Sequence, residues 1–108
     1  MQVIINAQMW RIVREPGNSP NLMRSDGTYT LGMTDNRTHT IYIHERAEGQ
    51  MYEKILSHEI VHAYCFSNHI YMDLATEEIV ADFVATHGRS VLNIVDGLIL
   101  RHKKRAIV

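Results

Sequence analysis

Residues 50–68 have the sequence QMYEKILSHEIVHAYCFSN, and this stretch decides the fold. The apolar side chains of Leu56, Ile60 and Ala63 recur at the spacing of one helix face. An α-helix turns about 100° per residue, so these positions fall on the same side. The pattern therefore predicts a helix of roughly 16 residues that ends near Ser67 and Asn68.

The predicted helix contains the pattern HExxH at residues 58–62, HEIVH. His58 and His62 lie one turn apart on one face, where both imidazoles can bind one metal ion. Glu59 lies about 60° around the helix from His62, so its carboxylate can reach a metal-bound water without being a ligand. With this composition, roughly 0.03 chance matches to the pattern are expected. The motif therefore predicts a Zn²⁺ site with Glu59 as the catalytic base.

A catalytic zinc ion usually has three protein ligands, so a third is needed. Glu78 and Asp82 are four residues apart and share a face of a second predicted helix. Glu78 is the predicted third ligand, and Asp82 is predicted to accept a hydrogen bond from the free ring N–H of a ligand histidine. The competing interpretation is that Glu77 and Glu78 are only favourable residues in the first turn of a helix.

Two further residues that follow the motif, Cys65 and His69, could also contribute to the metal site. If the helix continued, His69 and Cys65 would lie on the same side as the two motif histidines. His69 is thus the main rival for the third ligand position. For Cys65 we favour a small buried side chain, the commonest fate of a free cysteine.

The rest of the chain predicts an α+β architecture within one domain, residues 1–108. Strands are expected at residues 3–5 and 9–13, and a hairpin at residues 28–33 and 38–43 with a turn at 34–37. A loop is expected at residues 15–21, which contain both prolines. A second helix is expected from its cap at Thr76 to a stop at Gly88, and a third from Ser90.

Composition narrows the partners and the compartment. Eleven Lys and Arg residues against twelve Asp and Glu give a net charge of −1, which argues against nucleic acid as a partner. The apolar run at residues 91–100 is too short to cross a membrane. A single cysteine, which cannot form an intramolecular disulfide, and no recognisable signal peptide favour a cytoplasmic protein.

These motifs resemble those of the gluzincin metallopeptidases, whose pattern is HExxH followed by ExxxD. Here HEIVH is followed by EIVAD at residues 78–82. The small size, the strand pair before the motif and the run ExxADF are similar to the minigluzincins and the ImmA/IrrE-like intracellular peptidases, which phages and mobile elements often carry. The resemblance covers residues 28–88. It implies a zincin-like fold: a small, largely antiparallel or mixed sheet packed on the HExxH helix, with two further helices completing the core.

The function implied by the resemblance is zinc-dependent hydrolysis of peptide bonds, with Zn²⁺ held by His58, His62 and Glu78. The substrate is expected to bind in extended form along a strand edge. Gly32 would permit close approach of its backbone there, although a structural bulge explains it equally well. Candidates for stabilising the oxyanion are His39, His44, Tyr64, Tyr71 and His87. The alternative is a non-catalytic, zinc-stabilised regulatory or interaction module that contacts DNA through the basic residues 101–105.

Overall fold

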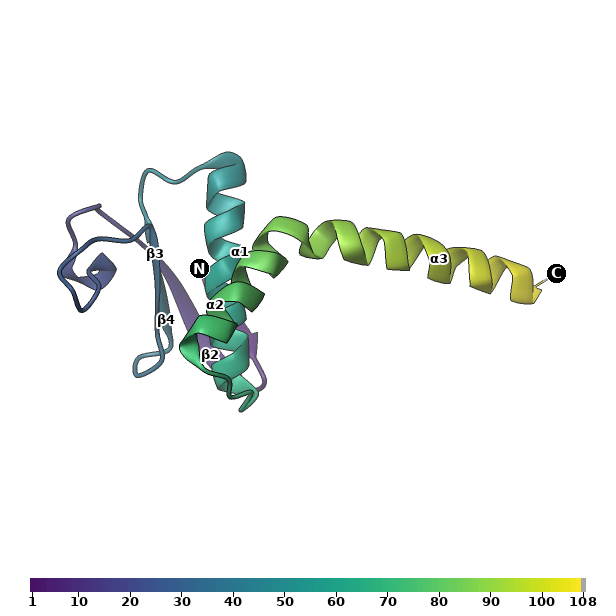
Figure 1. Cartoon of the computed structure of the whole chain (residues 1–108), viewed down its shortest axis with the longest axis horizontal. Helices are drawn as coiled ribbons and strands as arrows, with labels where there is room; N and C mark the ends of the chain where they lie inside the picture. Colours follow the sequence, from purple (N-terminus) through teal and green to yellow (C-terminus); the bar gives the residue numbers. More distant parts are fainter. Residues whose placement is uncertain (108) are drawn as a thin grey trace.

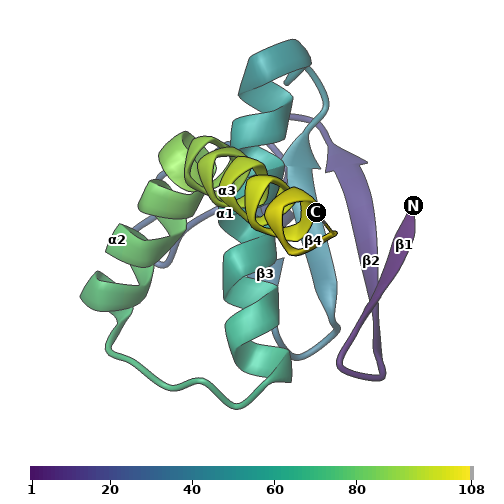
Figure 2. The same ribbon diagram turned by 90° about the vertical axis from the view of Figure 1, so that its right-hand side faces the viewer.

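The protein consists of a four-stranded sheet, a long helix on one face of that sheet, and a second helix that leads into a projecting third helix (Figures 1 and 2). The computed structural model describes residues 1–107, with side chains to residue 105. The strands are β1 (Gln2–Ile5), β2 (Gln8–Glu15), β3 (Gly32–Asp35) and β4 (Thr40–His44). The helices are η1 (Pro20–Leu22), α1 (Gly49–Ser67), α2 (Leu74–Phe83), η2 (Val84–Gly88) and α3 (Arg89–Ile107).

The sheet is mixed, with the strand order β1-β2-β4-β3. The pairs β1–β2 and β3–β4 are antiparallel, whereas β2 and β4 are parallel, with Ile12 opposite Ile41. The expected hairpin therefore exists, but its first strand is Gly32–Asp35 rather than residues 28–33. The predicted turn was placed too early, because Thr34 and Asp35 pair with β4 despite their polar side chains.

The core lies between the sheet and α1. Ile41 and Ile43 are fully buried and alternate with half-exposed Tyr42, as expected for a strand with one covered face. Trp10 of β2 and Ala63 of α1 are also fully buried in the same cluster. Burial of these apolar side chains fixes α1 across the sheet.

Hydrogen bonds attach the carboxyl end of α1 to the start of the sheet. The indole N–H of Trp10 donates to Ser67 Oγ at 2.8 Å, and Ser67 Oγ–H donates to Gln8 Oε1 at 3.1 Å. The side-chain amide of Asn6 donates to the Ser67 carbonyl at 2.9 Å. These bonds satisfy a buried hydroxyl and fix the position of α1 along the strands.

Two sequence predictions about the later helices are wrong. The second helix is capped by Asp73, whose carboxylate accepts from the N–H of Thr76 at 2.8 Å, so Thr76 lies inside the helix. Gly88 does not end this helical stretch, because the π-helical turn η2 continues directly into α3. No helix of the described part of the chain is both long and apolar enough to cross a bilayer.

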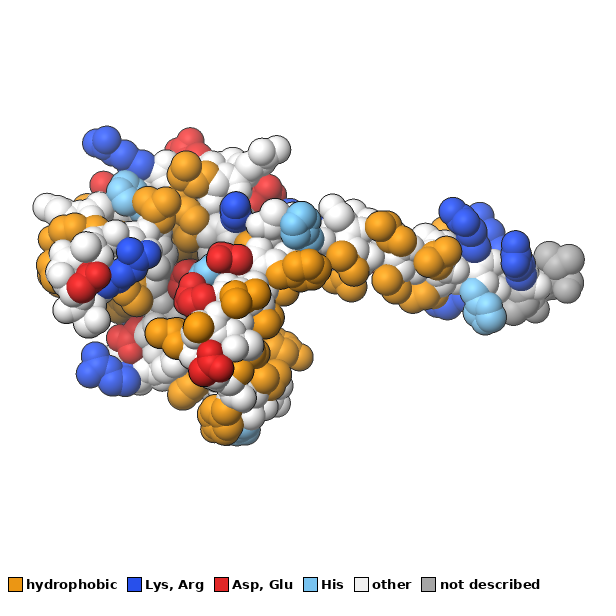
Figure 3. Space-filling model, viewed as in Figure 1, with side chains coloured by type: hydrophobic (Ala, Val, Ile, Leu, Met, Phe, Trp, Pro, Cys, Tyr) orange, Lys and Arg blue, Asp and Glu red, His pale blue; other side chains and the backbone are white. Residues whose placement is uncertain are grey.

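The third helix does not complete the core. All of its described side chains, residues 89–105, are exposed, and it extends from the body of the molecule (Figure 1). Its apolar side chains and the basic side chains near its far end are visible in Figure 3. The expectation of three packed helices fails because η2 carries the chain away from the sheet instead of turning it back.

Candidate metal centre

The site is built from α1 and α2, which pack against each other beside the edge strand β3 (Figure 2). His58, Glu59 and His62 come from α1, and Glu78 comes from α2. Ligand atoms of His58, His62 and Glu78 all lie within 4.8 Å of one another. These three predicted ligands are therefore close enough to bind one metal ion.

The distances between the ligand atoms fit a zinc ion. The Nε2 atoms of His58 and His62 are 3.2 Å apart, and the Glu78 carboxylate oxygens lie 3.1 and 2.9 Å from them, respectively. In a tetrahedron with metal–ligand bonds of about 2.0–2.1 Å, neighbouring ligand atoms are roughly 3.3 Å apart. The three side chains need only small movements to enclose the ion.

A carboxylate holds the far ring nitrogen of each histidine. His58 Nδ1 is 2.9 Å from Asp82 Oδ1, and His62 Nδ1 is 2.6 Å from Glu77 Oε2. An ionised carboxylate only accepts hydrogen bonds, so each Nδ1 carries a proton and donates it. In a neutral imidazole, Nε2 then has the free lone pair that a metal requires.

With both Nδ1 atoms protonated, the hydrogen-bond acceptors of the two histidines and of Glu78 point at one another. Both Nε2 lone pairs and the two oxygens of Glu78 converge on one point, where no donor among the neutral groups satisfies them. If both rings were protonated instead, two cations would face each other with their Nε2 atoms 3.2 Å apart. A bound cation between these groups relieves both problems, so the donor set fits zinc.

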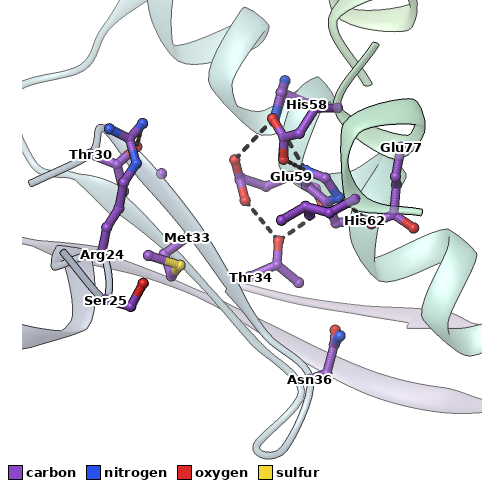
Figure 4. Close-up of a pocket in the computed structure, with 13 residues that line it drawn as sticks. Arg24, Ser25, Thr30, Met33, Thr34, Asn36, His58, Glu59, His62 and Glu77 are labelled. Atoms are coloured by element: carbon purple, nitrogen blue, oxygen red, sulfur yellow. Dashed lines mark hydrogen bonds and ion pairs between the residues drawn. The ribbon is translucent and has the colours of Figure 1, made fainter. Parts of the chain in front are cut away.

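Glu59 lies beside this cluster but is not one of its converging ligands. Its Oε2 is 3.9 Å from His58 Nε2, while its Oε1 accepts a hydrogen bond from the Thr34 hydroxyl at 2.8 Å (Figure 4). The residue is only 7% exposed, and this burial raises the pKa of Glu59 above its ordinary value. Thr34 therefore anchors one oxygen and leaves the other directed towards the metal ligands.

The edge strand passes so close to Glu59 that only glycine fits there. A Cβ added at Gly32 would lie 2.7 Å from Ile55 Cγ2, 3.0 Å from Glu59 Cγ and 3.2 Å from Glu59 Oε2. A structural bulge is therefore not needed to explain Gly32, because close approach to α1 already requires the missing side chain.

A cleft of about 490 Å³ opens along this edge. It lies between β3 and α2 and contains Glu59 and the three candidate ligands, and Figure 3 shows acidic side chains beside the hollow. Figure 4 shows Arg24, Ser25 and Thr30 on the side opposite α2. The lining residues are Arg24, Ser25, Thr30, Gly32, Met33, Thr34, Asn36, His58, Glu59, His62, Leu74, Glu77 and Glu78.

The rival ligand His69 is excluded from the cluster by the way α1 ends. The N–H of Ile70 donates to the Cys65 carbonyl at 2.9 Å, and that of His69 donates to Phe66 at 3.3 Å. This is a Schellman motif, in which His69 adopts the left-handed conformation with φ 56°. The helix stops before His69, whose Nδ1 instead lies 3.2 Å from the Tyr71 hydroxyl.

Other side chains singled out from the sequence lie away from the cleft lining. Cys65 is 4% exposed, as expected for a buried thiol. Its burial raises the pKa of the Cys65 thiol, and the negative charge of Glu77 raises it further. The candidates for oxyanion stabilisation are absent from the described lining of the cleft: His39, His44, Tyr64, Tyr71 and His87. His39, for example, stacks on Trp10 with ring centroids 4.7 Å apart.

Two contributors to the site were not predicted from the sequence. Glu77 contacts the ring of His62, although its position had suggested only a favourable first-turn residue. The three acids at residues 77, 78 and 82 were the signal in the sequence that more than one carboxylate could reach the histidines. Thr34 holds Glu59, but nothing in a polar stretch of predicted turn indicates such a contact.

Comparison with known proteins gives no relative from which to transfer a function. No family model matches the chain, and neither the curated proteins nor the solved structures include a significant match. The interpretation of the site therefore depends on its own chemistry.

Proposed function

We propose that the protein is a zinc-dependent metallopeptidase of the gluzincin type, with Zn²⁺ bound by His58, His62 and Glu78. The observation that carries this proposal is the convergence of three ligand side chains, with both histidines oriented by carboxylates and Glu59 beside them. A purely structural zinc site commonly has four protein ligands, whereas this cluster has three and opens into a cleft. Three ligands leave a position for water or substrate.

Held by His58, His62 and Glu78, a zinc ion would supply Lewis-acid chemistry: it would polarise the substrate carbonyl and lower the pKa of a water molecule. Glu59 is the proposed general base: Oε1 is anchored by Thr34, and Oε2 accepts the water proton and delivers it to the leaving amine. Asp82 and Glu77 keep the two histidines in the tautomer and orientation that zinc requires.

The edge strand β3 is the proposed binding site for the substrate backbone. It pairs with β4 on one side, so its other side offers unpaired backbone groups beside the cleft. An extended peptide can add to this edge by main-chain hydrogen bonds. The contact between Thr34 and Glu59 would place the bound chain next to the catalytic base.

The test combines metal content and hydrolysis in untagged protein. We expect about one zinc per parent chain by mass spectrometry, little in Glu78→Ala, and an unchanged amount in His69→Ala. Glu59→Gln should retain zinc but lose about 10²- to 10⁴-fold in cleavage of a peptide mixture. Absence of metal in the parent, even after zinc is supplied, would exclude the proposal. Full activity of Glu59→Gln would exclude Glu59 as the base.

The second candidate is a zinc-stabilised module without catalytic activity. The exposed basic side chains of α3 near residues 101–105 favour it, because they are available to contact phosphate groups. Stoichiometric zinc without hydrolysis, together with a salt-dependent DNA mobility shift lost on removal of residues 101–108, would select this alternative.

A further inference from the structure

The cleft has one cationic side chain among its described lining residues, Arg24, besides its two histidines. The other charged groups in the lining are the carboxylates of Glu59, Glu77 and Glu78. All three already have partners in the site: Glu77 and Glu78 contact the histidines, and Glu59 accepts a hydrogen bond from Thr34. The charge of Arg24 has no such role in the metal centre, so its presence in the same cleft needs another explanation.

The backbone around Arg24 is held in a defined shape. Leu22 is fully buried, Met23 pairs with Tyr29, and the Arg24 N–H donates to the Thr28 carbonyl at 2.7 Å. The Gly27 N–H donates back to the Arg24 carbonyl at 2.9 Å, with Gly27 at φ 87°. Residues 22–30 therefore form a closed turn that presents the arginine from a fixed base.

The guanidinium itself is oriented but forms no direct ion pair with a described carboxylate. Arg24 Nη2 donates to Thr30 Oγ1 at 3.3 Å, which leaves most of its N–H donors free. Among the described residues, no carboxylate oxygen lies within 4.0 Å of this guanidinium. The nearby acid Asp26 accepts hydrogen bonds from the N–H and hydroxyl of Thr28 to Oδ1 at 2.9 and 2.6 Å. These bonds, and to a smaller extent the charge of Arg24, lower the pKa of Asp26, but the two side chains form no direct ion pair.

Position next to the edge strand relates Arg24 to the reaction. Its partner Thr30 precedes Gly32, the first residue of β3, by two residues, and the chain bends at Leu31 between them. Gly32 lies directly beside Glu59, so the guanidinium is within reach of a peptide residue near the bond that Glu59 would help to cleave. Figure 4 shows Arg24 across the cleft from Glu77, with Glu59 between them beside His58 and His62.

We infer that Arg24 is a specificity-determining residue that binds a carboxylate of the peptide substrate within about two residues of the scissile bond. This inference rests on the proposed peptidase function and names its substrate class. Guanidinium and carboxylate form paired, charge-assisted hydrogen bonds, for which a free planar fork is suited. The carboxylate is either the carboxyl terminus of the peptide or an Asp or Glu side chain, since both present the same two oxygens.

The test uses three pools of N-acetylated hexapeptides with neutral residues at random positions and the zinc-loaded full chain. One pool ends in a free carboxylate, a second has an amidated terminus and one internal Glu, and a third has Gln in place of that Glu. Cleavage is followed by mass spectrometry. Binding to the zinc-loaded Glu59→Gln variant is measured separately by displacement of a fluorescent peptide from the first pool. The first two pools identify the source of the carboxylate.

We expect the parent to prefer one or both carboxylate pools over the Gln pool. Arg24→Ala should lower kcat/KM and affinity for that pool by about 10- to 100-fold and leave the Gln pool unchanged. Arg24→Glu should reverse the preference, favouring peptides in which Lys replaces the Glu. The matched control is Arg37→Glu, which makes the same charge change at a side chain 92% exposed and outside the cleft lining.

The outcomes separate this inference from the proposed function. Cleavage without carboxylate preference, or a preference that survives Arg24→Glu, overturns the role of Arg24 and keeps the peptidase. Carboxylate-dependent binding that Arg24→Glu abolishes supports Arg24 even where the parent cleaves no pool. A preference lost equally in Arg37→Glu would show a long-range charge effect and overturn the inference. If the zinc-loaded protein neither binds nor cleaves any of the pools, both the role of Arg24 and the peptidase function are overturned.

Discussion

The body of the molecule and α3 use apolar residues in opposite ways. In the body, Ala63 of α1 is fully buried in one cluster with Ile41 and Ile43 of β4, and this packing positions the metal ligands. In α3, Ile94 and Leu98 are 66% and 56% exposed although the helix is comparably rich in aliphatic residues. The difference shows that hydrophobic spacing predicts a helix in both places, but only contact with the sheet makes a helix part of the scaffold.

The largest contrast is expected for one substitution made in both regions. Ile43→Ala removes a fully buried side chain and should lower the free energy of unfolding by about 2–5 kcal/mol. Ile94→Ala removes a side chain that is 66% exposed and replaces it with a better helix former, so it should change stability by less than about 0.5 kcal/mol. Urea unfolding of the two variants measures the difference. Equal losses would mean that α3 is packed against the body in solution.

The same contrast explains which parts of the fold were predictable. The strand alternation around Ile41 and the helical spacing around Ile60 arise from burial on one face, so they leave a pattern in the sequence. The pairing partners of β2 leave no such pattern, and its parallel contact with β4 was not predicted. The path of α3 was predicted wrongly, because an apolar face indicates a need for cover but does not say which surface provides it.

The site shows a similar division. His58, Glu59 and His62 were predictable because helical spacing alone brings them together. Predicting Glu78 as the third ligand required contact between two separate helices, and the structure does place Glu78 next to the two histidines. His69 stayed a rival until the end of α1 was known, because its exclusion depends on the left-handed backbone that ends the helix.

A second contrast concerns a carboxylate at the site and one on α3. Glu77→Gln keeps the shape of the side chain but removes the charge that orients His62, so zinc affinity should fall by about 10- to 100-fold. Asp82→Asn should lose less, because the Asp82 side chain is 70% exposed whereas that of Glu77 is 20% exposed. Asp96→Asn on α3 removes one negative charge without contacting the site and is the control.

Competition with a chromophoric chelator measures zinc affinity in these three variants. An affinity of Glu77→Gln equal to that of the parent would show that the negative charge of Glu77 is not needed, because the glutamine oxygen can still accept a hydrogen bond from His62 Nδ1. A loss in Asp96→Asn as large as that in Glu77→Gln would mean that the net charge of the protein, rather than the charge placed beside His62, controls metal binding.

The smallest effect is expected from Gly97→Ala on α3, and the same substitution at Gly32 in the body is its contrasting partner. Gly32→Ala places a Cβ 2.7 Å from Ile55 Cγ2 and 3.0 Å from Glu59 Cγ, so it should cost about 1–3 kcal/mol of stability and displace the proposed base. Gly97→Ala meets nothing within 4 Å and replaces a poor helix former. It should stabilise α3 by about 0.5–1 kcal/mol.

The gain from Gly97→Ala should remain local, because α3 packs mainly against η2 rather than the sheet. Amide hydrogen exchange should therefore slow by about two- to fivefold in the middle of α3, while the unfolding midpoint of the body stays unchanged. A higher midpoint for the body would show that the two regions unfold together. In that case the sheet and α1 would depend on α3 for stability, and the contrast between the regions would hold for their exposure but not for their folding.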